Sequence, residues 1–351
     1  LCLISRALSL ALAAALPISC SDDDDPGVTE PSEPPSWRLI QQKLPSALLS
    51  VQVVDNGDVY AVGSDVIDGR GPYVLRYDGV AWTRLPAGVG GDLWWLHEIG
   101  ADRILMCGAN RLILSFQPST GSFTKMEVPE GDDVLYGIWG LERDDLWAVG
   151  GDGRCGVALH YNGTTWSERA LPEAEGIECV PTLFKVWGTS GQDVRMVGAL
   201  GVTLAYDGSE LTFEQTDTKR TLLTLHGSAD GEFSVAVGGA QSGEIRELID
   251  GAWVDVTPDR TRQMLGVNVG RSGVAVAAGV GTTTMRREAD GWVTERNGML
   301  AVNDLTFHGV WVDDDDNAWA VGGSLLVPPF DRGVIAYYGT FTPSSEVVNG
   351  R

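Results

Sequence analysis

The chain has 351 residues, of which 43% are hydrophobic and 21% are charged, with 45 glycines and 12 tryptophans. This composition is typical of a folded protein rich in turns and excludes an intrinsically disordered chain. The formal net charge of -23 argues against nucleic acid as a partner and against direct contact with an anionic membrane, because lysine and arginine are too few to neutralise phosphates.

Residues 1–20 have the pattern of a signal peptide of the lipoprotein type. Arg6 precedes an apolar run over residues 7–18, which is too short to span a bilayer, and Cys20 follows. The residues just before Cys20 resemble a bacterial lipobox, which implies lipidation of this cysteine. Pro17 departs from the usual aliphatic residue, so ordinary signal cleavage is the alternative. In both cases the chain is expected to be exported, and with a lipid anchor it would stay at the cell envelope or cell surface.

Residues 21–36 are predicted to be a disordered acidic tether. Four aspartates are followed by a Pro-, Glu- and Ser-rich stretch that offers too little apolar surface to fold. Because the net charge of -23 would repel an anionic membrane surface, we expect membrane association only through the N-terminal lipid.

From residue 48 onward the sequence repeats about every 43 residues, a period typical of propeller blades. The clearest copy has four β-rich runs, a to d, at residues 135–140, 145–150, 157–163 and 165–172. Run b ends in glycine in every copy, which we expect where the backbone needs a positive φ or where a neighbouring blade approaches closely. These glycines are Gly63, Gly108, Gly150, Gly198, Gly238, Gly279 and Gly322.

Asp-Gly or Asn-Gly pairs separate runs c and d in five copies, for example at residues 78–79 and 162–163, and predict tight antiparallel hairpins. One position of run a is apolar throughout and is predicted to face the core. Its members are Val51, Leu96, Ile138, Val186, Leu225, Val267 and Val310.

The two ends of the array predict how the ring closes. The seventh copy lacks a convincing run d, whereas residues 37–45, ahead of the first run a, look like the other d runs. We therefore expect an all-β, seven-bladed β-propeller of four-stranded antiparallel blades over residues 37–342, in which the N-terminal strand completes the last blade. Residues 343–351 are predicted to be a C-terminal tail.

The repeats carry W-A-V-G at residues 147–150 and 319–322 and H-Y-N-G-T-T-W at residues 160–166. With these motifs the chain resembles bacterial exported propellers with Trp- and Gly-rich repeats, which are broadly similar to Kelch and Asp-box propellers. The resemblance implies the architecture but not an activity. Tyr161 stands where an Asp box needs its aspartate, so the shared Gly and Trp are explained by hairpin geometry and core packing.

Three cysteines follow the signal segment. Cys107 replaces an apolar residue of run b and is predicted to be a small buried hydrophobe. Cys155, in a b–c loop, and Cys179, in the connection to the next blade, belong to loop classes that share one face of a propeller. An oxidising compartment favours a disulfide between them, with two free loop thiols as the alternative.

A second equivalent position of run a combines polar and aromatic side chains. By pseudo-symmetry these residues should lie near one end of the central channel, where aromatic faces and polar groups suit a sugar or peptide. In the alternative interpretation, the tryptophans pack between blades and the polar groups contact channel water. This candidate ring consists of Gln52, His97, Trp139, Trp187, His226, Asn268 and Trp311. No ligand spacing supports a metal site at its two histidines.

No catalytic or cofactor motif occurs in the sequence, so no cofactor and no catalytic residue is predicted. We expect a monomeric, non-enzymatic binding or scaffold propeller at the bacterial cell envelope that recognises a protein or glycan through one face of the ring. The alternative is a glycan-active hydrolase or lyase of the sialidase-like type, which needs several arginines, a carboxylate and a tyrosine in one pocket. In the sequence repeats we find the arginines scattered among strands and blades with no shared equivalent position, which favours binding; examples are Arg76, Arg195, Arg246 and Arg286.

Overall fold

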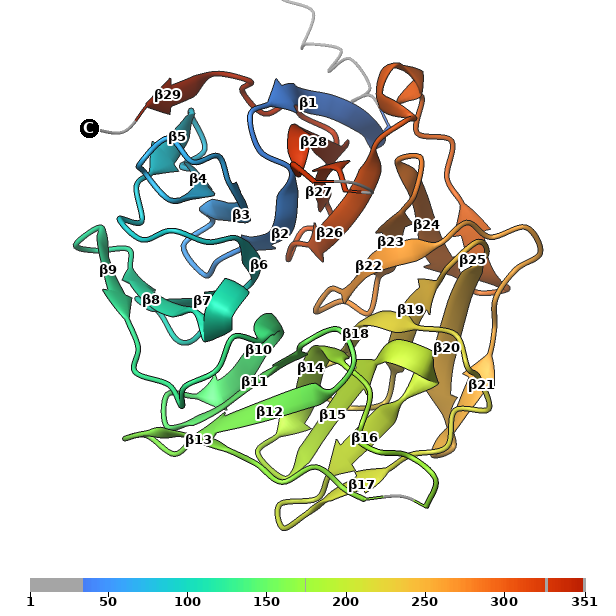
Figure 1. Cartoon of the computed structure of the whole chain (residues 1–351). Coiled ribbons are helices and arrows are strands. Elements are labelled where there is room, and N and C mark those ends of the chain that lie inside the picture. The colour runs from blue at the N-terminus through green and yellow to red at the C-terminus, as the bar shows by residue number, and fades with distance from the viewer. Residues whose placement is uncertain (1–33, 174, 326–327, 350–351) are drawn as a thin grey trace, which may run out of the picture. The chain divides into compact units, whose positions relative to one another are not determined.

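The computed structural model describes residues 34–173, 175–325 and 328–349. In these residues seven sheets, each with four antiparallel strands, surround a central axis, with strand a of each sheet innermost (Figure 1). The predicted all-β seven-bladed propeller is therefore confirmed. Short 3-10 turns at Ala109–Arg111, Ala199–Gly201 and Leu300–Val302 are the helices of the described residues, and no helix there is long and apolar enough to cross a membrane.

Each blade follows the order a, b, c, d from the axis outward. Blades 1 to 3 are formed by β2 (Leu48–Val53), β3 (Val59–Asp65), β4 (Pro72–Tyr77) and β5 (Trp82–Leu85); β6 (Leu93–Glu98), β7 (Ile104–Gly108), β8 (Ile113–Gln117) and β9 (Ser122–Lys125); and β10 (Val134–Glu142), β11 (Asp145–Gly151), β12 (Gly156–Tyr161) and β13 (Trp166–Glu168). Blades 4 to 6 are formed by β14 (Leu183–Ser190), β15 (Asp193–Gly198), β16 (Thr203–Tyr206) and β17 (Leu211–Phe213); β18 (Leu222–Gly227), β19 (Ser234–Gly239), β20 (Gly243–Ile249) and β21 (Ala252–Asp255); and β22 (Met264–Val269), β23 (Ala275–Gly279), β24 (Thr283–Glu288) and β25 (Gly291–Thr294).

The last blade contains strands from both ends of the chain. It consists of β26 (Thr306–Val312), β27 (Ala318–Ser324), β28 (Asp331–Gly339) and β1 (Ser36–Leu44). β1 runs antiparallel to β28, with Ser36 opposite Gly339 and Leu44 opposite Gly333. The predicted closure by the N-terminal strand is confirmed, and the strand includes Ser36, which the sequence had placed in the tether.

The C-terminal segment also forms a strand, which the sequence did not predict. β29 (Val347–Asn349) pairs with β5 in parallel and adds a fifth strand to blade 1. The tail expected at residues 343–351 is therefore wrong for these three residues. An isolated three-residue run gives no periodic signal, and its pairing depends on an outer edge that other parts of the chain create.

The recurring glycine of strand b has a cause other than the two that we considered. At all seven positions an added Cβ would overlap the carbonyl oxygen of the residue that leads into or begins strand a of the same blade, for instance Val134 for Gly150. There the a–b register shifts by a bulge in every blade, for example between Leu135 and Gly137. The glycine therefore permits close approach within one blade.

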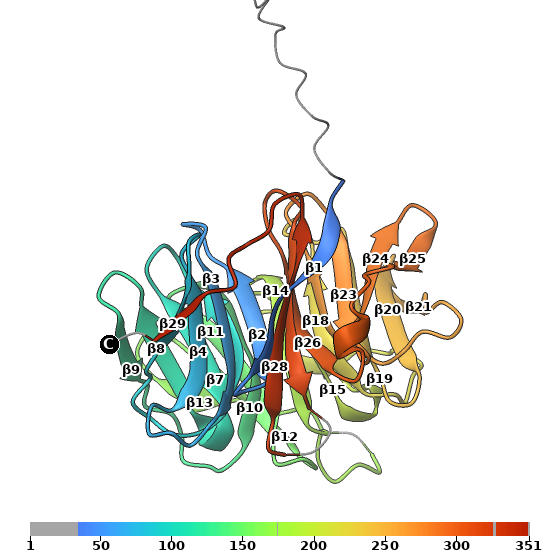
Figure 2. The same cartoon turned by 90° about the horizontal axis from the view of Figure 1, so that it is seen from above.

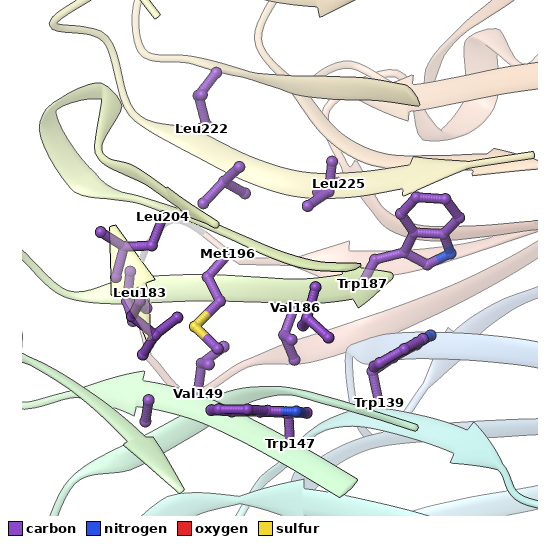
Figure 3. Packing of buried hydrophobic residues seen from close by; sticks show 14 of the residues in the cluster. Trp139, Trp147, Val149, Leu183, Val186, Trp187, Met196, Leu204, Leu222 and Leu225 are labelled. Carbon is purple, nitrogen blue, oxygen red and sulfur yellow. The ribbon is translucent and has the colours of Figure 1, made fainter. Parts of the chain in front are cut away.

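Buried side chains from facing sheets form the core between adjacent blades. The predicted apolar position of strand a is at most 2% exposed in every blade, as in Ile138 and Val186. Figure 3 shows part of the cluster formed by blades 3, 4 and 5, in which Met196 lies between Val149 and Leu204 and the indoles of Trp139 and Trp187 lie at one end. Both faces of each blade are apolar because both pack against neighbours.

Candidate binding site at one mouth of the channel

The strand directions divide the loops between two faces of the ring. Seen edge-on, the strands run from one face to the other, with hairpins and connections at both (Figure 2). The a–b hairpins border one end of the channel, which we call the channel mouth. A cavity of about 630 Å³ lies there and is lined by residues of all seven blades.

Six of the seven residues of the candidate ring line this cavity, namely Gln52, His97, Trp139, Trp187, His226 and Trp311. The seventh, Asn268, is not part of the lining, and its side-chain nitrogen lies 3.2 Å from Nε2 of His226. Asn268 is only 2% exposed and Trp139 4%, whereas His97, His226 and Trp311 are half-buried. The structure thus brings the predicted residues together at one place, and their role in binding a ligand stays a prediction.

The polar members of the ring hydrogen-bond to the next blade. The side-chain oxygens of Gln52 and Asn268 accept from the backbone N–H of Glu98 (3.0 Å) and Val312 (2.8 Å). Nε2 of His97 donates to the carbonyl of Gly140 (2.8 Å) in the same manner. These side chains connect neighbouring a strands, which is a structural role that the sequence interpretation had not included.

The tryptophans of the ring extend to the next blade where that blade has a glycine. A Cβ at Gly188 would lie 2.9 Å from the indole of Trp139, and a Cβ at Gly227 would lie 2.5 Å from the indole of Trp187. The glycines therefore make room for the rings. This packing favours the interpretation that most of each indole belongs to the inter-blade core and that only an edge faces the cavity.

The two histidines of the ring contribute hydrogen bonds rather than charge. Burial lowers the pKa of His226 to about 3, and burial also lowers the pKa of His97. Both imidazoles are therefore neutral at pH 7. Nδ1 of His226 accepts from the backbone N–H of Val269 (3.2 Å), which again connects adjacent blades.

The rim of the cavity is acidic, a feature that the sequence analysis missed. Its charged lining residues are Asp55, Glu98, Arg271, Asp313, Asp314 and Asp315. The carboxylate of Glu98 accepts from the backbone N–H of Asp55 (3.0 Å), and burial raises the pKa of Glu98 to about 7. Most of these residues lie in the a–b hairpins, directly after the ring position, so the repeat alignment contained the signal.

Arg271 extends from the a–b hairpin of blade 6 across to two other blades. Its guanidinium lies 3.1 Å from the carboxylate of Asp314 in blade 7 and 3.4 Å from that of Asp55 in blade 1. All three side chains are largely exposed, at 73%, 69% and 58%. Among the described residues that line the cavity, Arg271 is the one lysine or arginine, and this bridge joins it to the acidic rim.

The opposite mouth is aromatic. The bulged position of strand a carries Trp94, Tyr136 and Phe184 in successive blades, with ring centroids 5.0 Å and 5.1 Å apart. Nζ of the buried Lys185 lies 3.2 Å from the centroid of Trp95, and burial lowers the pKa of this lysine to about 7. The sequence analysis did not single out these residues.

The remaining predicted sites lie outside the cavity. Cys155 and Cys179 form a disulfide between the b–c loop of blade 3 and the connection to blade 4. Cys107 is buried and unpaired. Cys20 lies outside the described residues, as do the signal segment and most of the tether. Within residues 34–349, apart from the three that the structure does not describe, no group of three or more His, Cys, Asp or Glu could hold a metal ion.

Comparison with known proteins supports the fold and no specific family. No family model and no curated protein matches the sequence. Among solved structures, the WD40 β-propeller domain of Doa1 has a TM-score of 0.65 at 10% identity, with 87% of this chain and 97% of that chain covered. YCF48 from Cyanidioschyzon merolae has a TM-score of 0.63 at 13% identity over 86% and 98% of the two chains. YCF48 bound to D1 peptide has a TM-score of 0.51 at 13% identity over 82% and 78%. At these identities the likeness shows the propeller fold alone.

Proposed function

We propose that this chain is a non-enzymatic binding propeller, exported to the cell envelope and lipid-anchored at Cys20, that recognises a protein partner through the channel mouth. The observation that carries the proposal is the cavity of about 630 Å³, which is lined by residues of all seven blades, among them three tryptophans and five carboxylate residues. A concave site with aromatic walls and a few charged groups suits a side chain or short segment of a partner. YCF48, a structure of similar fold, has been solved with a bound peptide.

The arrangement of arginines favours binding over glycan hydrolysis. Arg76 and Arg286 do occupy equivalent positions on strand c, contrary to our comparison of the sequence repeats. Each, however, is paired within its own blade, Arg76 with Asp58 (2.8 Å) and Arg286 with Glu295 (2.9 Å). Among the described residues, the cavity lining contains one arginine, Arg271, and no tyrosine. A sialidase-like site would need several arginines and a tyrosine there.

Two matched tryptophan substitutions in blade 5 test the proposal. Ala229 is exposed in the a–b hairpin and lines the cavity, so Ala229→Trp should obstruct it. Gln241 is exposed in the b–c loop of the same blade, on the opposite face, and Gln241→Trp is the control. The native chain and the control should capture the same protein from envelope extract, and Ala229→Trp should capture much less of it.

The result that would contradict the proposal is equal capture by the two variants, because the partner would then bind elsewhere. Retention of a defined glycan on an array, reduced by Ala229→Trp and not by Gln241→Trp, would replace the protein partner with a carbohydrate one. Size-exclusion chromatography checks that each variant is folded and elutes at the volume of the native chain.

A further inference from the structure

We propose that the channel mouth binds a cationic group of its partner, a lysine or arginine side chain, and that Arg271 occupies part of this site as an internal competitor. This inference rests on the proposed function and adds the chemistry of the ligand. It depends on the cavity, on its charge and on the bridge made by Arg271.

The lining of the cavity has a large excess of negative charge. Five carboxylate residues, Asp55, Glu98 and Asp313 to Asp315, face one guanidinium, that of Arg271. Burial raises the pKa of Glu98 and of Asp313, and the charge of Arg271, which lowers the pKa of Glu98, does not outweigh its loss of hydration. A cation that enters the cavity would favour the ionised form of these two carboxyl groups, and in a partly desolvated place its attraction to them is stronger than in water.

Aromatic edges lie beneath this charge. Trp139, Trp187 and Trp311 belong to the floor of the cavity, and Trp311 is the most exposed of the three. An alkylammonium or guanidinium group on an apolar stem can contact the indoles with its methylenes and the carboxylates with its charged end. A free metal ion or a polyanion would not use this combination of groups.

Arg271 shows that a guanidinium fits against the rim. It spans blades 6, 7 and 1 and contacts Asp314 and Asp55 at 3.1 Å and 3.4 Å. Because all three side chains are exposed, these contacts stabilise the fold little, and a ligand can displace them at small cost. The long, flexible arginine stem allows the guanidinium to move aside without a change in the backbone.

The test measures binding of a fluorescein-labelled Gly-Arg-Gly-Arg-Gly peptide to the full chain by fluorescence anisotropy at low ionic strength. A peptide with citrulline in place of each arginine keeps the shape and removes the charge. The arginine peptide should bind more tightly than the citrulline peptide. Asp314→Asn combined with Asp315→Asn should weaken its binding by roughly 3- to 10-fold, a factor that corresponds to the loss of one or two charge contacts.

The net charge of -23 attracts cations to the whole surface, so each variant has a control of equal charge on the opposite face. Asp132→Asn combined with Asp259→Asn changes two exposed aspartates of d–a connections and should leave the affinity nearly unchanged. Arg271→Gln should tighten binding of the arginine peptide roughly 3-fold or more, because it removes the competitor. Arg154→Gln, which breaks an exposed pair with Glu178 on the opposite face, should not.

Equal binding of the arginine and citrulline peptides overturns the inference, and so does an Arg271→Gln effect no larger than that of Arg154→Gln. The proposed function has a separate outcome. If Ala229→Trp abolishes capture of the partner and the peptides show no dependence on charge, the channel mouth binds a partner by other means. If the peptides behave as expected and Ala229→Trp has no effect on capture, the natural partner binds elsewhere.

Discussion

Replacement of Trp37 by alanine tests whether the N-terminal strand holds the ring closed. Trp37, Ile40 and Leu44 of β1 are 8%, 7% and 7% exposed, and Nε1 of Trp37 donates to Glu295 of blade 6 (2.6 Å). Burial of three such side chains contributes about 5–9 kcal/mol, which is comparable with the whole stability of a typical domain. Trp37→Ala alone should lower the free energy of unfolding by about 3–5 kcal/mol.

Urea unfolding followed by circular dichroism measures this effect, with the exposed Gln42→Ala on the same strand as control, for which we expect a change within about 0.5 kcal/mol. Deletion of residues 36–44 should go further and expose the edge of β28, so the protein should aggregate or form dimers in light scattering. A deletion variant that stays monomeric and unfolds at the native urea concentration would refute the reasoning.

Three further predictions concern the glycine, the disulfide and the acidic rim. Gly150→Ala should lower the free energy of unfolding by about 2 kcal/mol or more, because its Cβ would overlap the carbonyl of Val134. The control is Gly90→Ala, whose Cβ has only Asp65 nearby and which should lower the same quantity by less than about 0.5 kcal/mol in the same urea titration. Replacement of Cys155 and Cys179 by serine removes a disulfide between residues 24 positions apart and should lower the free energy of unfolding by about 3 kcal/mol by the loop-entropy model. A reductant should lower the thermal midpoint of the native chain and should leave that of the variant unchanged. Burial raises the pKa of Glu98 from 4.5 to about 7, so the stabilisation by its protonated form should be present below pH 4.5 and be lost as the pH rises through 7. Glu98→Gln should flatten that part of the plot of unfolding free energy against pH. An unchanged plot would contradict the assignment.

The sequence was sufficient for the fold because the propeller repeats its local rules in every blade. The glycine at the end of strand b, the Asp-Gly or Asn-Gly hairpins and the apolar position of strand a each recur at a fixed spacing, so a single blade could be checked against the others. The closure by β1 followed from the missing fourth strand of the last repeat. β29 could not be found in this way, because it belongs to no repeat and pairs with an edge far away in the sequence.

The candidate site was predicted in part. The alignment of the repeats placed all seven ring residues at one mouth, but it gave no information about the direction of each side chain. The contacts of Gln52 and Asn268 with the next blade depend on the tilt between neighbouring sheets, which a linear alignment does not contain. Arg271 and the carboxylates of the rim lie just after the ring position, but their residue types do not recur from blade to blade, so a comparison of the repeats did not single them out.

The first strand of the chain, β1, belongs to the last blade, and this arrangement affects how the number of blades can change. The unit that repeats along the sequence runs from one fourth strand through the next third strand, so it is offset by one strand from the sheet that forms in space. Insertion or loss of one entire unit would leave the first segment free to join whichever sheet comes last. Such a chain can change to six blades by deletion or to eight by duplication of one unit, because the N-terminal strand would still complete the last blade.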